Sequence, residues 1–498
     1  MKNNPRYPRL VIAGLRGGSG KTTLSVGLIA FWSNKGLDVV PYKKGPDYID
    51  AGWLSSAAGR PCYNLDPFLI GREKVLSSFR RHYEDAQCAV IEGNRGLYDG
   101  MDEAGTYSTA ELAKLLKSPV LLIMDCTKVT RTSAAMVLGM QRFDRSVDIR
   151  GVVLNRIAGA RHEKVVKESI EKYCSIPVLG AIPRLHEDFF SERHMGLVPF
   201  QEHPDVERAV ARAAEIAEKY LDSDGIREIA EGSGNLDWER GTQGERRRTG
   251  TKRANSADPS SIVQRPSSVV TIGIVRDSAF QFYYPENFDA LEQGGARLLE
   301  VSALQAKELP DIDALYIGGG FPETNAITLA SNTSFRMSLK RAVERGLPVY
   351  AECGGLMYLG KSLSLGGKAY PMAGIFPLTF RLESRPQAHG YTIVKVTGKN
   401  PFYKKGTVLK GHEFHYSRVT EATCFADTGT LDFSFTMQRG EGIVNKRDGL
   451  CYKNVLATYT HVHACGAPEW ADGLIKRAKR YKKEKSGSAV KKQDHSIT

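Results

Sequence analysis

A glycine-rich segment at residues 14–23 lies between a short apolar run at 10–13 and an apolar, helix-like stretch at 24–31. In a strand, loop and helix in this order, backbone N–H groups converge on phosphate oxygens and the helix N-terminus adds positive potential. Lys21 would offer a cation to the terminal phosphates, and Thr22 would offer a hydroxyl to Mg²⁺. We therefore predict that ATP is bound by Gly17, Gly18, Ser19, Gly20, Lys21, Thr22 and Thr23.

Short runs rich in Val, Ile and Leu alternate with helix-like stretches along the first half of the chain. They occupy residues 10–13, 39–42, 89–92, 120–125, 152–155 and 178–182. This alternation is typical of a parallel sheet covered by helices. A second pattern of the same kind includes 269–275, 314–317 and 348–351, and no internal repeat links the halves. We therefore predict an α/β protein with two doubly wound domains, because 498 residues are enough for two cores.

The composition changes between the two patterns. Residues 222–268 are rich in Gly, Ser, Thr and Arg, and three arginines follow one another at 246–248. Such a stretch is typical of a flexible polar linker. We therefore expect an ATP-binding domain at 1–221, a second α/β domain at 269–475 and a basic tail at 476–498.

A metal-bound triphosphate also needs carboxylates at the ends of neighbouring strands, where the crevice of a parallel sheet opens. Asp47 follows the second apolar run, and Glu92 ends the third. We predict that Asp47 and Glu92 bind Mg²⁺ together with Thr22. Asp125, which ends the next run, is a further candidate. The alternative is that these residues cap helices or turns, because Asp is frequent in loops for conformational reasons.

Residues 348–359 place Cys353 at a turn between a strand-like and a helix-like stretch. The glycines that follow it permit the tight turn of a nucleophile elbow, and a helix N-terminus favours thiolate over thiol. We therefore predict that Cys353 is a catalytic nucleophile. The alternative, a small buried apolar residue, fits the other cysteines better.

A cysteine nucleophile needs a base, and residues 458–463 contain His461 and His463. In an extended segment the two side chains point to opposite faces, so only one of them can readily face Cys353. We predict that His461 is the base and that His463 is either its orienting partner or a structural residue. The segment 318–320 offers backbone N–H groups after another strand, so we predict an oxyanion hole formed by Gly319, Gly320 and Gly354.

Two further histidines, His412 and His415, lie in the strand-like stretch 411–417. A zinc site needs additional ligands at consistent spacing, and no nearby cysteine supplies them. We therefore expect polar or substrate contacts from these histidines rather than a metal site.

The formal net charge of +13 does not by itself indicate a nucleic-acid partner. Nine basic and two acidic residues lie in the tail at 476–498, so the body of the chain is only mildly basic. A tail of this kind is usually solvated, and contact with nucleic acid is the alternative. The eight cysteines form no CxxC pair, which is typical of a reducing compartment.

The sequence contains no pattern typical of export or of a membrane anchor. Residues 1–9 are polar and lead directly into a strand, whereas a secretory signal has an apolar segment first. Apolar runs such as 120–124 are much shorter than the roughly 20 residues of a spanning helix. We therefore expect a cytoplasmic protein that binds neither membrane nor nucleic acid.

Together these segments resemble the cobyrinate a,c-diamide synthase family across nearly the whole chain. The motifs that carry the resemblance are Gly-Gly-Ser-Gly-Lys-Thr-Thr at 17–23, Gly-Pro-Asp-Tyr-Ile-Asp at 45–50, Gly-Leu-Tyr-Asp-Gly at 96–100, Arg-His-Met-Gly-Leu-Val-Pro at 193–199, Phe-Tyr-Tyr-Pro-Glu-Asn at 282–287, Ala-Glu-Cys-Gly-Gly-Leu-Met-Tyr-Leu at 351–359 and Gly-His-Glu-Phe-His-Tyr-Ser at 411–417. The resemblance implies a P-loop, dethiobiotin-synthetase-like domain followed by a class I glutamine amidotransferase-like domain.

The resemblance also implies an activity, the ATP-dependent amidation of the a and c acetate carboxylates of a tetrapyrrole with glutamine as nitrogen donor. ATP and Mg²⁺ would activate each carboxylate as an acyl phosphate. The family pattern makes Cys353 the nucleophile and His461 its base, and Tyr48, Asp50 and His415 are expected to contact the substrate.

Some features depart from the commoner members of this family. His389 stands where another residue is common, and the linker is longer and more basic. The sequence therefore does not decide whether the tetrapyrrole substrate is cobyrinate, nickel-sirohydrochlorin or another sirohydrochlorin-type ring. The oligomeric state also stays open, a homodimer included.

Three alternative interpretations remain for the glycine-rich loop or for the whole protein. The first is a glycine-rich turn that binds no ligand, because Leu15 stands where the usual phosphate loop has a glycine. A partition-type ATPase switch is another, because Arg16 stands where the signature lysine of that class lies. Such a switch has no need for Cys353 and a second α/β domain. A ligase that uses free ammonia is the third, and an intact pair of Cys353 and His461 argues against it.

Overall fold

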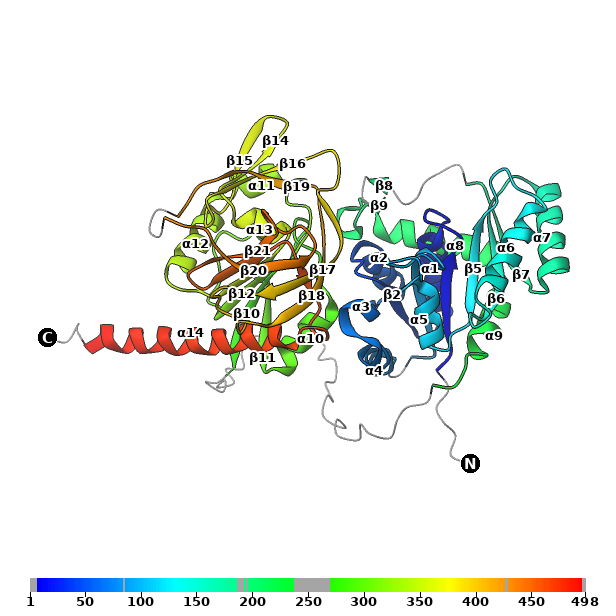
Figure 1. Ribbon diagram of the computed structural model, residues 1–498, viewed down its shortest axis with the longest axis horizontal. Coiled ribbons are helices and arrows are strands. Elements are labelled where there is room, and N and C mark those ends of the chain that lie inside the picture. Colours follow the sequence, from blue (N-terminus) through cyan, green and yellow to red (C-terminus); the bar gives the residue numbers. More distant parts are fainter. Residues whose placement is uncertain are drawn as a thin grey trace, which may run out of the picture.

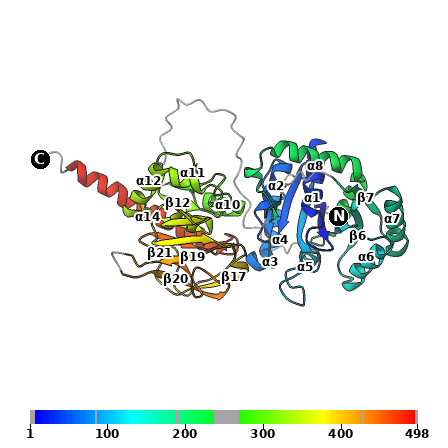
Figure 2. The same cartoon turned by 90° about the horizontal axis from the view of Figure 1, so that it is seen from above.

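The computed structural model describes residues 7–83, 86–185, 192–193, 196–236, 269–425 and 429–494. Most of the predicted linker, from 237 to 268, therefore lies outside the described residues. Two α/β domains lie side by side, the first formed by β1 to α9 and the second by β10 to α14 (Figure 1). Seen from above, they are two lobes that meet along one side of each (Figure 2).

The first domain is built on a seven-stranded sheet in the order β3-β2-β4-β1-β5-β6-β7, and every pair is parallel. Because the strands are parallel, the loops after β1, β2 and β4 lie at the same edge of the sheet. The strand order reverses at β1, which lies between β4 and β5, so a crevice is expected there. The strands are β1 (Arg9–Gly14), β2 (Val39–Lys44), β3 (Tyr63–Leu65), β4 (Cys88–Gly96), β5 (Val120–Asp125), β6 (Ile149–Ile157) and β7 (Val178–Pro183). A two-stranded ribbon, β8 (Glu192–Arg193) and β9 (Gly196–Leu197), follows.

Alternate residues of each strand of this sheet pack on opposite faces, so each face has its own apolar core. One face is covered by α1 (Lys21–Asn34), α2 (Ile49–Ala58), α8 (Val206–Tyr220) and α9 (Ser223–Glu231). The other is covered by α3 (Pro67–Ile70), α4 (Arg72–His82), α5 (Thr109–Leu115), α6 (Thr132–Phe143) and α7 (Ala160–Cys174). A short 3₁₀ turn, η1 (Phe200–Glu202), precedes α8.

The second domain has a ten-stranded sheet in the order β11-β10-β12-β13-β22-β21-β20-β17-β18-β23. The first five strands are parallel, and the remaining pairings are antiparallel. The strands are β10 (Val270–Val275), β11 (Ala296–Val301), β12 (Ala314–Ile317), β13 (Val349–Glu352), β17 (Ala388–Val396), β18 (Val408–His415), β20 (Asp432–Arg439), β21 (Arg447–Tyr452), β22 (Val455–Thr458) and β23 (His461–Val462). A smaller sheet joins β14 (Ser362–Leu365), β15 (Lys368–Pro371), β16 (Leu378–Leu382) and β19 (Ser417–Ala422).

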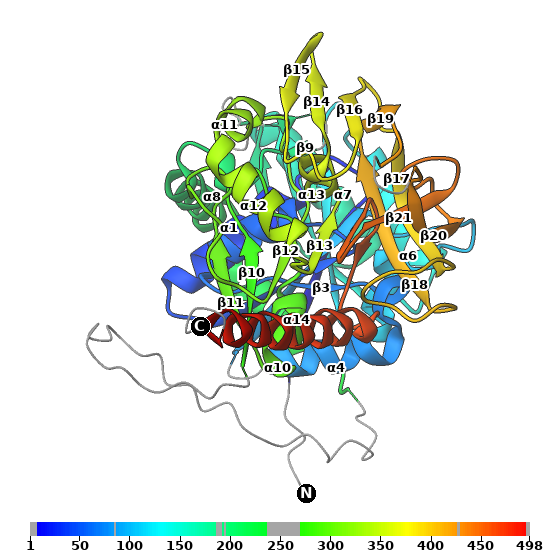
Figure 3. The same cartoon turned by 90° about the vertical axis from the view of Figure 1, so that its left-hand side faces the viewer.

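Helices cover both faces of the parallel part of this second sheet. On one face lie α11 (Ala326–Ser331), α12 (Thr333–Glu344) and α13 (Gly354–Leu359), and on the other lie α10 (Pro285–Gln293) and α14 (Pro468–Asp494). Helix α14 runs across the domain beside α10 (Figure 3) and then extends beyond it (Figure 1). Trp470 and Leu474 of α14 are buried against the sheet.

The predicted α/β class with two wound domains is confirmed, and the antiparallel half of the second sheet is an addition to it. Two segment boundaries need correction. Residues 223–231 of the expected linker form α9, because Ile226 and Ala230 are buried in the first domain. Residues 476–494 of the expected basic tail continue α14, in which Ala478 is still buried, and 495–498 lie outside the described residues. Within the described ranges, no helix is both long and apolar enough to cross a membrane.

Candidate active site

The phosphate loop keeps the order that the sequence predicts. β1 ends at Gly14, and α1 begins at Lys21, whose side chain is buried. Gly20 has a φ of 93°, in the left-handed region that favours glycine. Asn155, at the end of β6, donates a hydrogen bond to the carbonyl of Ser19 at 3.0 Å. The loop is therefore held from the neighbouring strand, while its outer glycines stay exposed.

A group of charged side chains lies beside this loop. The hydroxyl of Thr22 donates a hydrogen bond to Oε1 of Glu92 at 2.9 Å, and Nζ of Lys43 lies 2.9 Å from the same oxygen. Lys43 also lies 2.9 Å from Oδ2 of Asp50 and 4.0 Å from Oδ2 of Asp47. The structure thus brings Asp47, Glu92 and Thr22 together, with a buried lysine among them to which the sequence analysis gave no role.

The environment of these groups sets their ionisation. Burial alone would lower the pKa of Lys43, but its three carboxylate neighbours raise it well above the ordinary value. Burial and the nearby Lys43 lower the pKa of Lys21. Burial raises the pKa values of Glu92 and Asp47. A persistent positive charge on Lys43 therefore balances the carboxylates that gather at the loop.

The same residues fit a divalent cation. Oε2 of Glu92 is buried and has no hydrogen-bond partner in the described part of the chain. A buried carboxylate oxygen without a partner is costly, and a hard cation is a suitable partner for it. Asp125 is differently placed, because its carboxylate pairs with Arg16 at 3.1 Å and with Arg156 at 2.9 Å.

The second predicted site is a sharp turn between β13 and α13. Cys353 sits at its apex with a φ of 48°, a strained value for a residue with a side chain. Its backbone N–H donates to the carbonyl of Thr458 on β22 at 2.8 Å, which holds the turn against the sheet. This is the nucleophile elbow that the sequence predicts.

Burial raises the pKa of the Cys353 thiol, and the carboxylates of Glu323 and Glu352 add to the effect. The N–H of Gly354, at the start of α13, lowers this pKa, in the direction expected of a helix N-terminus. Burial has the larger effect, so the surroundings favour the neutral thiol. Deprotonation of this thiol needs a base.

The glycine segment after β12 lies against both Cys353 and the predicted base. A Cβ atom on Gly354 would lie 3.0 Å from the backbone nitrogen of Gly320. A Cβ atom on Gly319 would lie 2.5 Å from Cε1 of His461. Cys353 and His461 thus flank the same loop, and Gly320 lines the pocket at Cys353.

His461 has a carboxylate partner that the sequence analysis missed. Its Nδ1 lies 3.4 Å from Oε2 of Glu352, the residue just before Cys353. Glu352 is fixed in turn by the hydroxyl of Tyr316, which donates to Oε2 at 2.9 Å, and by the N–H of Val462 at 3.1 Å. The only sequence signal for Glu352 was its place next to the cysteine.

His463 points elsewhere and is not the orienting partner of His461. Its Nε2 lies 3.5 Å from Oε1 of Glu286. Burial alone would lower the pKa of His463, but Glu286 raises it to about 10. Of the two roles left open for His463, the structure supports the structural one.

A small pocket opens onto the sulfur of Cys353, and His415 lines it together with Phe282, Glu323, Phe414 and Tyr416. Nδ1–H of His415 donates a hydrogen bond to the carbonyl of Ser417 at 2.8 Å, so the ring is held in place. Among the residues that the structure describes, His412 and His415 belong to no group of three or more His, Cys, Asp or Glu side chains that could hold a metal ion.

Comparison with known proteins covers both domains. Residues 10–197 match the model of the CobQ/CobB/MinD/ParA nucleotide binding domain, and residues 271–468 match that of the CobB/CobQ-like glutamine amidotransferase domain. The chain is 42% identical to the cobyrinate a,c-diamide synthase of Magnetococcus marinus, over 95% of this chain and 97% of the relative. It is 40% identical to the Archaeoglobus fulgidus protein of the same name, over 95% and 98%.

The chain belongs to the cobyrinate a,c-diamide synthase family. The resemblance drawn from the motifs is thereby confirmed, as is the prediction of a glutamine-hydrolysing ligase with a nucleotide-binding domain. The similarity extends through both domains, whereas a partition-type switch would need only the first.

In this member of the cobyrinate a,c-diamide synthase family the two sites approach each other through Tyr48. The ring of Tyr48, in the loop after β2, stacks on Phe282 at 5.2 Å and packs against Tyr284 at 4.7 Å. It also lies 5.4 Å from the ring of His461 and 5.6 Å from that of His412. Tyr48, which directly follows Asp47, is therefore in contact with the histidine that the sequence predicts as the base. Sequence analysis had assigned Tyr48 to substrate contact, and the structure shows an interdomain contact.

Proposed function

We propose that this protein amidates the a and c acetate carboxylates of cobyrinate, with glutamine as nitrogen donor and an acyl phosphate as intermediate. The observation that supports the proposal is the contact of Tyr48 with His461, which joins the loop after β2 to the second site. That loop also carries Asp47, which lies with Glu92 and Thr22 beside the phosphate-binding loop. The names and full-length coverage of the relatives support cobyrinate as the ring. Free cysteines at all eight positions fit a reducing cytoplasm, where ATP and glutamine are available.

The first domain would activate the carboxylate. A carboxylate resists attack by ammonia, because its carbonyl carbon is electron-rich and oxide is a poor leaving group. Lys21 would hold the terminal phosphates, and Mg²⁺, which would supply charge neutralisation, would be held by Thr22, Glu92 and Asp47. Lys43 would keep these carboxylates in place. Transfer of the γ-phosphate to the substrate oxygen then creates a good leaving group.

The second domain would release ammonia from glutamine. His461 takes the proton of the Cys353 thiol, and the sulfur attacks the side-chain amide carbon. The N–H groups of Gly319, Gly320 and Gly354 would bind the oxyanion of the tetrahedral intermediate. His461 then gives its proton to the leaving ammonia, while Glu352 holds the ring and stabilises its charged form. Water hydrolyses the glutamyl thioester, with His461 again acting as the base.

Ammonia must reach the acyl phosphate without a proton, so it needs a route poor in water. Tyr48, Phe282 and Tyr284 form an aromatic contact between the domains beside His461. We infer that ammonia passes along this contact from the second site to the first.

Mass spectrometry of the products tests the proposal. Reactions with ATP, Mg²⁺ and glutamine would be run in parallel on cobyrinate, nickel-sirohydrochlorin and metal-free sirohydrochlorin. We expect cobyrinate to gain two amides fastest. Faster diamidation of another ring would reassign the substrate, and ATP hydrolysis without amidation of any ring would contradict the ligase function proposed for this chain.

A further inference from the structure

Three side chains that are cationic or can become so lie at the interface between the two domains. None of them has a role in the reaction proposed above. Lys44 ends β2, Arg95 lies near the end of β4, and His389 lies on β17 of the second domain. Lys44 is buried, whereas Arg95 and His389 are exposed. We call these three residues the seam cluster.

The carboxylate of Asp66, next to Lys44, already has several partners. Nζ of Lys44 lies 4.0 Å from Oδ2 of Asp66 and 3.4 Å from the hydroxyl of Tyr391. That hydroxyl donates to Oδ2 of Asp66 at 2.6 Å, and Oδ1 of Asp66 accepts from the N–H groups that begin α3, those of Phe68 and Leu69. Asp66 is thus shared among four donors or cations and only partly balances Lys44.

Arg95 brings a second charge to the same place. It lies on β4, three residues after Glu92, and β4 pairs with β2 so that Glu92 is opposite Lys43, the neighbour of Lys44. No hydrogen bond or ion pair of Arg95 occurs within the described ranges. Its charge reaches both other members of the seam cluster, because burial and then Arg95 lower the pKa of His389, and Arg95 also contributes to the lowered pKa of Lys44.

His389 connects this charge to the second site. It lies two residues before Tyr391 on β17, so the two side chains share a face of the strand. The His389 ring packs against Phe414 at 4.5 Å, and the Phe414 carbonyl lies 3.9 Å from the sulfur of Cys353. Through His389, the seam cluster at the ends of β2 and β4 is therefore linked to the wall of the Cys353 pocket.

We propose that Arg95, Lys44 and His389 bind a peripheral carboxylate of the substrate, one that is not itself amidated. Positive side chains held close together repel one another when nearby carboxylates do not offset their charge. An anion bound among them removes this repulsion and accepts charged hydrogen bonds. A ring with several carboxylates needs such a contact, so that only the correct acetate reaches the phosphate loop. This inference rests on the proposed function, since the anion is a carboxylate of that substrate.

Steady-state kinetics of Arg95→Gln and His389→Asn test the seam cluster. We expect KM for cobyrinate to rise about tenfold in Arg95→Gln, the usual effect of losing a charged hydrogen bond. KM for ATP and KM for glutamine should stay unchanged, as should glutamine hydrolysis without the ring. Spectroscopic titration of cobyrinate without ATP should show the same weakening of binding.

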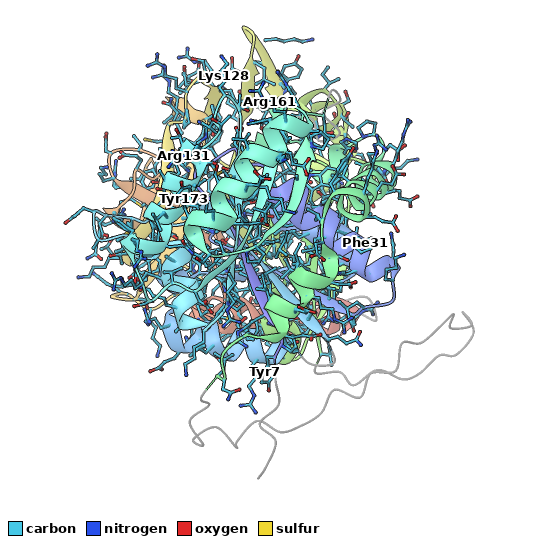
Figure 4. The ribbon with its side chains drawn as sticks, turned by 90° about the vertical axis from the view of Figure 1, so that its right-hand side faces the viewer. Tyr7, Phe31, Lys128, Arg131, Arg161 and Tyr173 are labelled. Atoms are coloured by element: carbon cyan, nitrogen blue, oxygen red, sulfur yellow. The ribbon has the colours of Figure 1, made fainter. Side chains whose placement is uncertain are left out.

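The matched control is Arg161→Gln. Arg161 is an exposed arginine on α7, on the face of the first domain turned away from the second (Figure 4). Its kinetic constants should equal those of the unmodified protein. An unchanged KM for cobyrinate in Arg95→Gln would overturn the inference, and so would an equal rise in KM for ATP, which would assign the cluster to phosphate. If the unmodified protein amidated no ring, the proposed function would fail instead.

Discussion

At the scale of single residues, the reactive groups depend on their neighbours. Burial and nearby carboxylates raise the pKa of Cys353, so the proposed reaction uses His461 as the base, and Oε2 of Glu352 lies 3.4 Å from Nδ1 of that histidine. Burial and the nearby Lys43 lower the pKa of Lys21. We expect a bound phosphate to stabilise the positive charge of Lys21. Each reactive side chain is therefore prepared for its partner by residues that do not react.

The first residue-scale prediction concerns Cys353→Ala. Without the sulfur no thioester forms, so glutamine-supported amidation should fall at least about 1,000-fold. Amidation supported by ammonium chloride should stay close to that of the unmodified protein, because the phosphate loop is untouched. Product formation with each nitrogen source measures this. Loss of both activities would mean that Cys353 serves the first domain or the fold.

The second concerns Lys21→Ala, which removes the cation at the phosphate loop. We expect amidation to fall on the order of 100-fold or more with either nitrogen source, because charge developing on the phosphate is no longer stabilised. Rates with glutamine and with ammonium chloride are the measurement. A variant that still amidated the ring would show that the nucleotide binds elsewhere.

The third concerns the ion pair of His463 and Glu286. Because the folded-state pKa of His463 is raised to about 10, the pair stabilises the fold fully below the unfolded pKa of roughly 6.5. This stabilisation is lost as the pH rises through the folded pKa. The difference in urea midpoint between the unmodified protein and His463→Gln should therefore be largest at pH 6 and shrink toward pH 10. A difference independent of pH would contradict this charge state.

At the scale of elements, the sequence predicts the parallel strands well, because six apolar runs between helices coincide with β1, β2, β4, β5, β6 and β7. Their loops place Lys21, Asp47 and Glu92 at one sheet edge. The sequence does not predict β17, β18 and β20, because their half-exposed residues form no continuous apolar run. It does not predict α9 either, because the two buried residues of that helix lie in a polar stretch. Glu352 and Lys43 were missed because their roles depend on partners distant in sequence.

The loop after β2 is the element that joins the two chemistries, and Tyr48 is its point of contact. In Tyr48→Ala the ring that packs on His461 and Phe282 is lost. We expect glutamine consumed per amide formed to rise several-fold, because ammonia escapes to solvent. Tyr48→Phe keeps the ring and should stay close to the unmodified ratio. Equal ratios in all three proteins would exclude a role for this contact.

At the scale of the whole molecule, polar contacts fix one domain against the other. They include Asn64 N–H with Glu286 at 3.2 Å, Lys74 with the Cys465 carbonyl at 2.6 Å, His82 with Asp289 at 3.3 Å and Gln281 with Glu202 at 3.0 Å. The carboxyl-end loops of both sheets meet at this interface. The two sites are thus neighbours in one assembly, although their residues lie in separate halves of the chain.

The proposed reaction requires ammonia to pass between the two sites inside the protein. Amidation of cobyrinate with ¹⁵N-amide glutamine, in the presence of an equal concentration of unlabelled ammonium, measures this directly by mass spectrometry of the diamide. We predict that both new amides carry ¹⁵N. Amides that carry the isotope ratio of the free ammonium would contradict internal transfer.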